Sequence, residues 1–261
     1  MKNCRLCQNN IVLQKELTKK TGDKENIYLC KKCGTFFIDP APVCYDNNDD
    51  SLITYYQKRE WWISNRMDKI FNKFIHINPS GKSILDIGSG IGYSGIIAGK
   101  YDLNYVGIEP NITLFNHAKN TLKINCINDY FPSSKIEKKF DFIILDNVLE
   151  HIYTPKSFFD EIINRLNPGG VLFLACPPTD WLRILLSTNE ILKNSSISRS
   201  FTIFDDLHEH VNYFSNNSIK YLISNHSGLN IISQFHHKEW SLPFHKLLNL
   251  TTGQYFIQKN N

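Results

Sequence analysis

Four glycines stand close together at the end of an apolar stretch, in the sequence ILDIGSGIGYSG at residues 84–95. Asp86 lies within the apolar part, and Gly88, Gly90 and Gly92 follow it at every second position. Glycine adopts backbone conformations that other residues avoid, and it lets main-chain atoms approach a ligand closely. A strand that runs into such a turn therefore predicts a ligand-binding site built largely from backbone.

Two cofactors are compatible with this turn. From Gly90 onward it matches G-x-G-x-x-G, the turn of dinucleotide-binding proteins. From Asp86 onward, with glycines at every second position, it is typical of proteins that bind S-adenosylmethionine. Glu109 stands where a carboxylate can accept hydrogen bonds from ribose hydroxyls, and Asp129 stands where one can bond an adenine amino group. Both acids suit either cofactor, so the turn alone leaves the choice open.

The N-terminal part of the chain contains two pairs of cysteines, each with a two-residue gap: Cys4 with Cys7, and Cys30 with Cys33. Each pair can direct both thiolates at one ion, and two pairs complete a tetrahedral Cys4 shell. We therefore expect a structural Zn²⁺ site in a module over residues 1–44, with no open position for catalysis. The remaining cysteines are expected to be small buried apolar side chains: Cys44, Cys126 and Cys176.

Strand and helix patterns alternate from residue 83 onward. Strands are expected at 83–87, 105–108, 125–128, 140–145 and 171–176, with helices near 93–100, 112–121 and 155–166. The stretches 229–236 and 254–258 are expected as two closing strands, and Ser215 as the cap of a helix. This alternation predicts an α/β fold with a doubly wound, Rossmann-like sheet of seven strands, which binds ligands at the carboxyl ends of its strands.

The chain is expected to have three parts: the zinc module at 1–44, a linker and helical segment at 45–80, and the α/β domain at 81–261. An insertion at about 179–206 interrupts the α/β pattern. Residues 52–77 carry an aromatic stripe at helical spacing. Core packing is the favoured interpretation of that stripe, and a lid over the cofactor is the alternative.

Two further segments separate the cofactors. FDFIILDNVLEHIYTP continues the fourth strand, and RLNPGG introduces the fifth. With the D-x-G-x-G-x-G turn and the acid at Glu109, they resemble class I S-adenosylmethionine-dependent methyltransferases over about residues 83–178. The resemblance implies methyl transfer and makes the dinucleotide match coincidental. It also implies a set of cofactor-binding residues: Asp86, Gly88, Gly90 and Gly92 around the methionine part and ribose, Glu109 at the ribose, Asp129 at the adenine and Asn147 near the sulfonium.

Methyl transfer to a hydroxyl needs a group that removes its proton, and histidine is the natural candidate. His151 follows the fourth strand, at the rim where an acceptor must enter. His208, Glu209 and His210 stand together in DDLHEHVNYFS, and a carboxylate beside a histidine orients it and tunes its basicity. A helix cap at His151 and a loop anchor at His210 are the structural alternatives.

The sequences CRLC, YLCKKCGTFF, LEH and H-E-H before Y-F-S resemble zinc-containing sugar methyltransferases, which act on nucleotide-linked deoxysugars. That resemblance places Glu209, His210 and His151 around the reacting sugar. Leu207 stands where the family has a tyrosine, and we expect no counterpart of the family's large C-terminal domain. We therefore expect O-methylation of a nucleotide-linked sugar, a surface-glycan building block or a related phosphorylated small molecule, with sugar C-methylation as an alternative. N-terminal lysines are candidates to meet the acceptor's phosphates: Lys15, Lys19, Lys20, Lys24, Lys31 and Lys32.

An RNA methyltransferase that grips RNA with its zinc module is the main rival. The net charge of +4 is too small to indicate nucleic-acid binding, and the fourth strand ends in Asp146-Asn147-Val148-Leu149 without the N-P-P-Y or D-P-P-Y of base-amino methylation. A non-enzymatic cofactor-binding protein is a second rival. The polar N-terminus and the short apolar runs predict a cytoplasmic protein without a membrane segment. The oligomeric state cannot be derived from the sequence.

Overall fold

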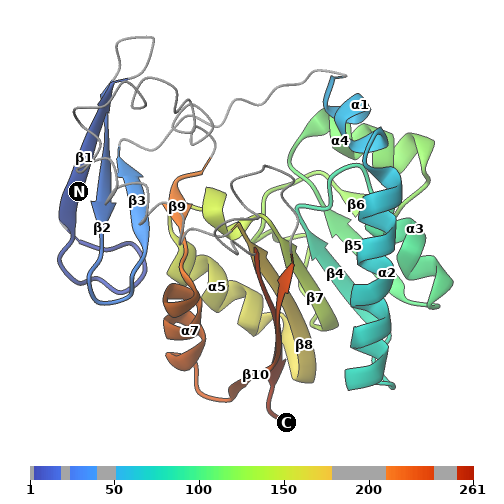
Figure 1. Cartoon of the computed structure of the whole chain (residues 1–261). Helices are drawn as coiled ribbons and strands as arrows, with labels where there is room; N and C mark the ends of the chain where they lie inside the picture. Colours follow the sequence, from blue (N-terminus) through green and yellow to red (C-terminus); the bar gives the residue numbers. More distant parts are fainter. Residues whose placement is uncertain (1–2, 19–23, 40–50, 178–209, 238–251) are drawn as a thin grey trace.

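The computed structural model describes residues 3–18, 24–39, 51–177, 210–237 and 252–261. Its centre is a seven-stranded sheet in the order β10-β11-β8-β7-β4-β5-β6 (Figure 1). The strands are β4 (Ser83–Ile87), β5 (Asn104–Ile108), β6 (Cys126–Ile127), β7 (Phe140–Asp146), β8 (Leu166–Cys176), β10 (Leu229–His237) and β11 (Thr252–Lys259). The predicted seven-stranded α/β fold is thus confirmed.

Five of these strands are parallel, and β11 joins the sheet antiparallel to both β8 and β10. The helical elements are α1 (Ser51–Gln57), α2 (Glu60–Ile77), α3 (Tyr93–Lys100), α4 (Ile112–Asn116), α5 (Pro155–Asn164) and α7 (Asn216–Ser224). A π-helical turn, η1 (His117–Thr121), continues α4, and a 3-10 turn, η2 (Leu149–His151), follows β7. Because all parallel strands end at one edge, η2 and the glycine turn after β4 meet there.

The apolar residues of the strands alternate between two buried faces. In β7, Ile143 and Leu145 pack with α5 and α7, whereas Phe142 and Ile144 pack with α2 and α3. Phe74 of α2 stacks on Phe142 with ring centroids 4.7 Å apart. The sheet is therefore covered on both faces, which explains why its central strands are almost wholly apolar.

A second sheet lies beside the first and combines three strands of the N-terminal region with one strand from far along the chain (Figure 1). Its order is β1 (Val12–Thr18), β2 (Lys24–Leu29), β3 (Phe36–Asp39) and β9 (Asn212–Tyr213). The first three strands belong to the expected N-terminal module, and β9 comes from the segment directly after His210. Side chains of this module, including Leu6 and Phe37, belong to the same buried cluster as α5 and α7.

Three elements differ from the sequence prediction. The helix expected over 52–77 is two helices, α1 and α2, with a break at Lys58 and Arg59. The third parallel strand has only two residues, β6, because residues 125 and 128 fall outside its pairing with β5. The strand expected at 171–176 begins earlier, at Leu166, and the Asn167–Gly170 stretch is a bulged part of β8, where the register against β7 shifts and Gly169 has a φ of +70°.

Other local predictions are confirmed. Ser215 caps α7 by accepting a hydrogen bond from the N–H of Ser218, whose hydroxyl bonds back to the N–H of Ser215. Cys126 and Cys176 are buried. Cys44 and the insertion expected at 179–206 lie outside the described residues. Within the described residues, none of the helices combines the length and apolar character needed to cross a membrane.

Candidate cofactor and acceptor site

A cavity of about 600 Å³ opens at the carboxyl ends of β4 and β7. The glycine turn forms one wall, α1 and the start of α2 form a second, and η2 with the start of the β9 segment forms the third. Its polar lining residues are Tyr55, Tyr56, Arg59, Arg66, Asp86, Ser89, Ser94, Asp146, Asn147, Glu150, His151 and His210. Residues separated by more than 150 positions in the sequence thus face one space.

The glycine turn has the backbone that the sequence predicts. Gly88, Gly90 and Gly92 have φ values of 74°, 56° and 92°, a region that side-chain-bearing residues rarely adopt. A Cβ on Gly88 would stand 2.7 Å from Val148. Gly88 and Gly90 line the cavity, whereas Gly92 caps α3 and packs on Ala118.

Asp86 lies buried at the base of the cavity and is 3% exposed. Its carboxylate accepts hydrogen bonds from the hydroxyls of Ser94 (2.5 Å) and Tyr105 (2.7 Å). Burial raises the pKa of Asp86 to about 6, although both hydroxyls act in the opposite direction. The carboxylate is therefore held in place and available to a cationic group of a bound cofactor.

Glu109 follows β5 and is tied to the glycine turn. One carboxylate oxygen accepts the N–H of Gly90 (2.8 Å) and the other accepts the N–H of Asn111 (2.9 Å). The acid therefore lies next to the glycine turn, and its role at the ribose stays a prediction. It is not among the residues that line the cavity, because its oxygens hold the surrounding backbone.

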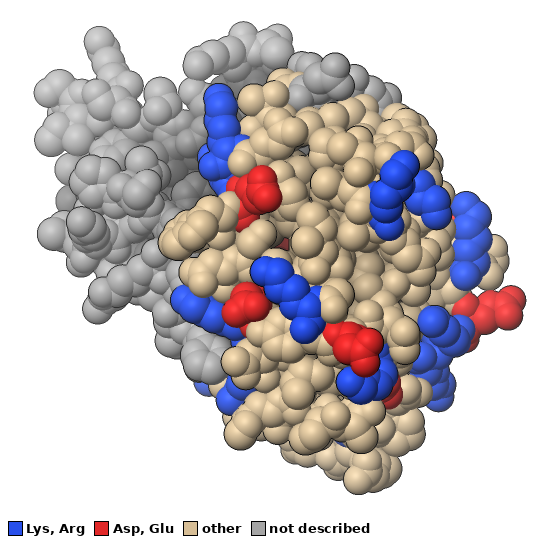
Figure 2. All heavy atoms as spheres, turned by 90° about the vertical axis from the view of Figure 1, so that its right-hand side faces the viewer, with Lys and Arg blue, Asp and Glu red and all other residues tan. Residues whose placement is uncertain are grey.

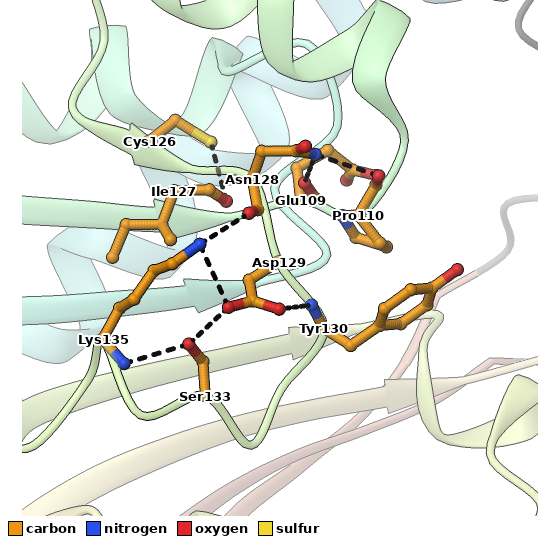
Figure 3. Close-up of polar contacts among 9 residues, drawn as sticks. All are labelled: Glu109, Pro110, Cys126, Ile127, Asn128, Asp129, Tyr130, Ser133 and Lys135. Atoms are coloured by element: carbon orange, nitrogen blue, oxygen red, sulfur yellow. Dashed lines mark hydrogen bonds and ion pairs between the residues drawn. The ribbon is translucent and has the colours of Figure 1, made fainter.

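Asp129 is held within its own loop (Figure 3). Its carboxylate accepts hydrogen bonds from the hydroxyl of Ser133 (2.8 Å) and the N–H of Tyr130 (2.9 Å), and it pairs with Lys135 at 3.2 Å. The bond from Ser133 and then the one from Lys135 lower its pKa. Asp129 lies outside the lining of the cavity.

The end of β7 places two polar residues at the cavity. Asp146 forms a two-point ion pair with the buried Arg66 of α2, in which Nη2 donates to Oδ1 at 2.9 Å and Nη1 contacts Oδ2. Asn147 follows with a φ of 54°, and its N–H donates to the carbonyl of Ala175 (3.0 Å). The ion pair fixes α2 against the strand end, and the strained turn presents Asn147 to the cavity.

Three ionisable side chains meet at the opposite wall: Glu150 and His151 of η2, and His210. One nitrogen or oxygen of each lies within 4.8 Å of the others, and the two imidazole rings stand edge to face at 4.8 Å. Neither carboxylate oxygen of Glu150 accepts a hydrogen bond of ordinary length from the described residues. Its Oε1 lies 4.0 Å from Nε2 of His210. The Glu150–His151–His210 cluster is thus a set of acid–base groups directed at the cavity.

Burial shifts the pKa values of two of these groups in opposite directions. It raises the pKa of Glu150 to about 8, helped by the charge of Asp146. It lowers the pKa of His210 to about 3, helped by the neighbouring His151. Near neutral pH, Glu150 is therefore mostly protonated and His210 is neutral. The sequence predicted His151 and His210 but not Glu150, whose position before His151 in the LEH sequence was the available signal.

His208, Glu209 and Leu207 lie outside the described residues. The predicted pairing of Glu209 with His210 therefore stays a prediction, and Glu150 is the carboxyl that the structure places beside His210. The described N-terminal lysines are not among the residues that line the cavity, which contains Arg59 and Arg66 instead.

Helix α1 and the start of α2 cover the glycine turn with aromatic rings. A Cβ on Gly90 would stand 3.5 Å from the ring of Tyr56, and Tyr55 and Trp62 also line the cavity. Residues farther along α2, such as Phe71 and Phe74, are fully buried in the core. Core packing is therefore the right interpretation of the second half of the aromatic stripe, whereas Tyr55, Tyr56 and Trp62 of its first half face the site.

The four N-terminal cysteines also come together. The sulfurs of Cys4 and Cys33 are 3.5 Å apart, those of Cys7 and Cys30 are 3.4 Å apart, and all four lie within 4.8 Å of one another. Three of the four side chains are buried. This spacing fits the corners of a tetrahedron around one ion with four thiolate ligands.

Comparison with solved structures shows the fold. The plantazolicin methyltransferase BpumL, in complex with SAH, superposes with a TM-score of 0.59 at 16% identity, over 83% of this chain and 91% of that one. Magnesium protoporphyrin IX methyltransferase from Synechocystis PCC 6803, with bound SAM, gives a TM-score of 0.52 at 11% identity, over 76% and 79%. Both structures share the arrangement of strands and helices described above.

Sequence relatives match a shorter part. A ubiquinone biosynthesis O-methyltransferase of Coxiella burnetii (strain RSA 493 / Nine Mile phase I) is 28% identical over 105 residues, 38% of this chain and 45% of the relative. An uncharacterized methyltransferase of Mycobacterium leprae (strain TN) is 28% identical over 109 residues, 40% and 39%. The matched segments thus span less than half the length of these curated relatives. The family described as "Methyltransferase domain" matches residues 57–234, more than half of the chain, and the chain therefore belongs to this family.

Proposed function

We propose that this protein transfers a methyl group from S-adenosylmethionine to an oxygen atom of a small acceptor. The observation that supports this most strongly is the common cavity of the glycine turn and the Glu150–His151–His210 cluster. The cavity has the size of a site for a cofactor-sized ligand. The glycines of the turn carry no side chains, so a cofactor can lie directly against the backbone. Asp86 supplies a buried carboxylate for the ammonium group of that cofactor.

When bound, S-adenosylmethionine supplies an activated methyl group on its sulfonium. The protein's tasks are to align the acceptor and to remove its proton. We assign removal of the acceptor's proton to His151, because burial disfavours a positive charge on His210. His151 would take and keep the proton of the acceptor oxygen, which would receive the methyl group, with the electron pair of the carbon–sulfur bond left on the sulfur of the cofactor. His210 and Glu150 stand beside His151 at the same wall of the cavity.

For the acceptor, we propose a nucleotide-linked sugar, a glycan building block or a related phosphorylated small molecule. Arg59 supports this choice, because it lines the cavity and its guanidinium lies over the ring of Tyr55 at 3.7 Å. Arg66 is unsuited to a phosphate, since Asp146 engages it at two points. In this proposal Arg59 takes the role that the sequence suggested for the N-terminal lysines.

We also propose that the four N-terminal cysteines hold one structural Zn²⁺. Their sulfurs converge without any other described ligand, and the module they join is a small sheet that buries little apolar surface by itself. A closed thiolate shell would stabilise the fold and would take no part in methyl transfer.

RNA is the weaker acceptor candidate. On the face seen in Figure 2, the lysines and arginines of the described residues are scattered among acidic and uncharged residues, without the continuous basic stripe that grips a phosphate backbone. Salt-dependent binding of bulk RNA by the zinc-loaded chain would favour RNA over a small acceptor.

The first test is calorimetric titration of the zinc-loaded protein with S-adenosylhomocysteine, and with NADH in parallel. Binding of the former alone supports the proposed cofactor, whereas binding of NADH alone would overturn the methyltransferase activity. A screen with methyl-labelled S-adenosylmethionine then compares nucleotide sugars, sugar phosphates and phenols. His151→Asn should lower kcat by about 100-fold or more while cofactor affinity stays, and His76→Asn, an exposed histidine of α2, is the control.

A further inference from the structure

Strand β9 stands between the N-terminal sheet and the wall of the cavity. On one side its two residues pair antiparallel with β3. On the other side, the side-chain amide of Asn212 donates to the carbonyl of Ile152 (2.6 Å), and the N–H of Val211 donates to the carbonyl of Glu150 (3.0 Å). His210 lies two residues before this strand, and Val211 stands between them. Its position in the cavity is thus set by contacts on both sides of β9.

Arg5 makes the central contact on the N-terminal side. This side chain is only 5% exposed, and it donates to the carbonyl of Val211 from Nη1 (2.9 Å) and to the carbonyl of Ile38 from Nη2 (3.0 Å). Asp39 lies 3.7 Å from the guanidinium, and the ring of Tyr153 lies 4.0 Å from it. One buried cation therefore links β3, the segment after His210 and the segment after His151.

The chemistry of this contact requires an arginine. A buried charge is costly unless acceptors lie close to it, and here two carbonyls accept hydrogen bonds from the guanidinium and one carboxylate lies 3.7 Å away. The planar guanidinium reaches both carbonyls at once, whereas a lysine ammonium is a single point charge. Since the carbonyl of Val211 belongs to the residue next to His210, a change at Arg5 moves that ring without touching the cavity itself.

We infer that Arg5 is a positioning residue, which through Val211 fixes His210 beside His151 and Glu150. The effect of Arg5 on catalysis rests on the proposed function. The effect of Arg5 on the position of His210 rests on the contacts described above. It also gives the cysteine module a role in the site, because Arg5 stands between Cys4 and Cys7. The module then supports the wall of the cavity that carries His210 and is more than an appended stabilising unit.

The test uses the full, zinc-loaded chain and follows histidine ring signals by NMR in wild type, Arg5→Lys and Arg5→Met. His210→Asn assigns the His210 signals. Groups that face this ring are Glu150 and His151 of η2, and Tyr213 of β9, whose ring lies 5.9 Å away. In the wild type His210 should not titrate between about pH 5 and pH 8, because its pKa is about 3. In Arg5→Lys it should titrate within that range, while affinity for S-adenosylhomocysteine stays within about twofold.

Arg165→Lys is the matched control. Like Arg5, Arg165 donates a hydrogen bond to a backbone carbonyl, here that of Glu137, but it lies at the opposite edge of the sheet. If His210 titrates alike in wild type and Arg5→Lys, the inference is wrong. If Arg5→Met fails to fold, the titration of His210 in Arg5→Lys still tests the inference. The proposed function fails separately, if wild-type protein neither binds S-adenosylhomocysteine nor transfers a methyl group while Arg5→Lys still shifts His210.

Discussion

At the scale of single residues, the carboxyl group of Glu150 should make stability depend on pH. Burial raises its pKa to about 8, so the folded state holds a proton that the unfolded chain releases near pH 4 to 5. Stability from this group is therefore present at low pH and is lost as the pH rises through about 8. Between pH 6.5 and 8, the unfolding free energy of wild type should fall relative to Glu150→Gln by about 1 to 2 kcal/mol.

Urea unfolding of both proteins at several pH values measures this difference. The comparison with Glu150→Gln cancels other groups that titrate, including His210, which is neutral in the folded protein but titrates near pH 6.5 in the unfolded chain. Glu137→Gln, at an exposed glutamate, should reproduce the wild-type curve. Parallel curves for wild type and Glu150→Gln would show that the Glu150 carboxyl is ionised throughout.

Arg59 gives a second prediction at this scale. If it binds an acceptor phosphate, Arg59→Met should raise the KM for a phosphorylated acceptor by about tenfold or more, because a charge-assisted hydrogen bond is lost. The KM for S-adenosylmethionine and the kcat should change little. Steady-state kinetics with a phosphorylated sugar and its phosphate-free counterpart separates the cases, since an equal rise for both acceptors would assign Arg59 to packing of Tyr55 alone.

At the scale of elements, the turn between β4 and α3 should tolerate no side chain at Gly88. An alanine there must adopt a φ of 74° and would meet Val148 at 2.7 Å. The strain is on the order of 1 to 3 kcal/mol, so calorimetry should show S-adenosylhomocysteine affinity lowered by about tenfold or more. Gly99→Ala in α3 is the control: no other group lies within 4 Å of its added Cβ, so affinity should be unchanged.

Local patterns can be recognised in the sequence, and they therefore predicted the alternating strands, the glycine turn and the Ser215 cap. Long-range pairing leaves no such signal. Nothing in the dipeptide Asn212-Tyr213 shows that it pairs with β3, and nothing near Arg66 shows that its partner is Asp146, 80 positions away. The acid at Asp129 was predicted from its place after a strand, but Ser133 and Lys135, only a few residues on, take up its oxygens.

Glu150 was missed for a related reason. A glutamate in a short 3-10 turn is ordinarily exposed. Glu150 is buried only because the tertiary arrangement places it between the end of β8 and the segment that begins at His210. The aromatic stripe of residues 52–77 could not be divided from sequence either, because periodicity does not show where α1 ends and α2 begins. Periodicity also does not show that Trp61 at the start of α2 is exposed (76%) whereas Phe74 near its end is buried.

At the scale of the whole molecule, the two sheets form one body. The buried cluster that contains Leu6, Phe37 and the cysteines Cys4, Cys30 and Cys33 continues into the core beneath α5 and α7. The hydroxyl of Ser218 in α7 also donates to the carbonyl of Cys33 (3.1 Å). Loss of order in the cysteine module should therefore reach the methyltransferase domain through α7 as well as through β9.

This continuity gives the last prediction, for removal of the metal. The purified chain should contain one Zn²⁺ per molecule by elemental analysis, and a strong chelator should lower the unfolding temperature in a single cooperative transition, because both sheets share one core. Cys30→Ser should lose the metal and unfold at the lower temperature without chelator. Cys126→Ser, outside the cluster, should keep one ion per chain. A zinc-free wild type with an unchanged unfolding temperature in chelator would show that the four thiols hold the module together by packing alone.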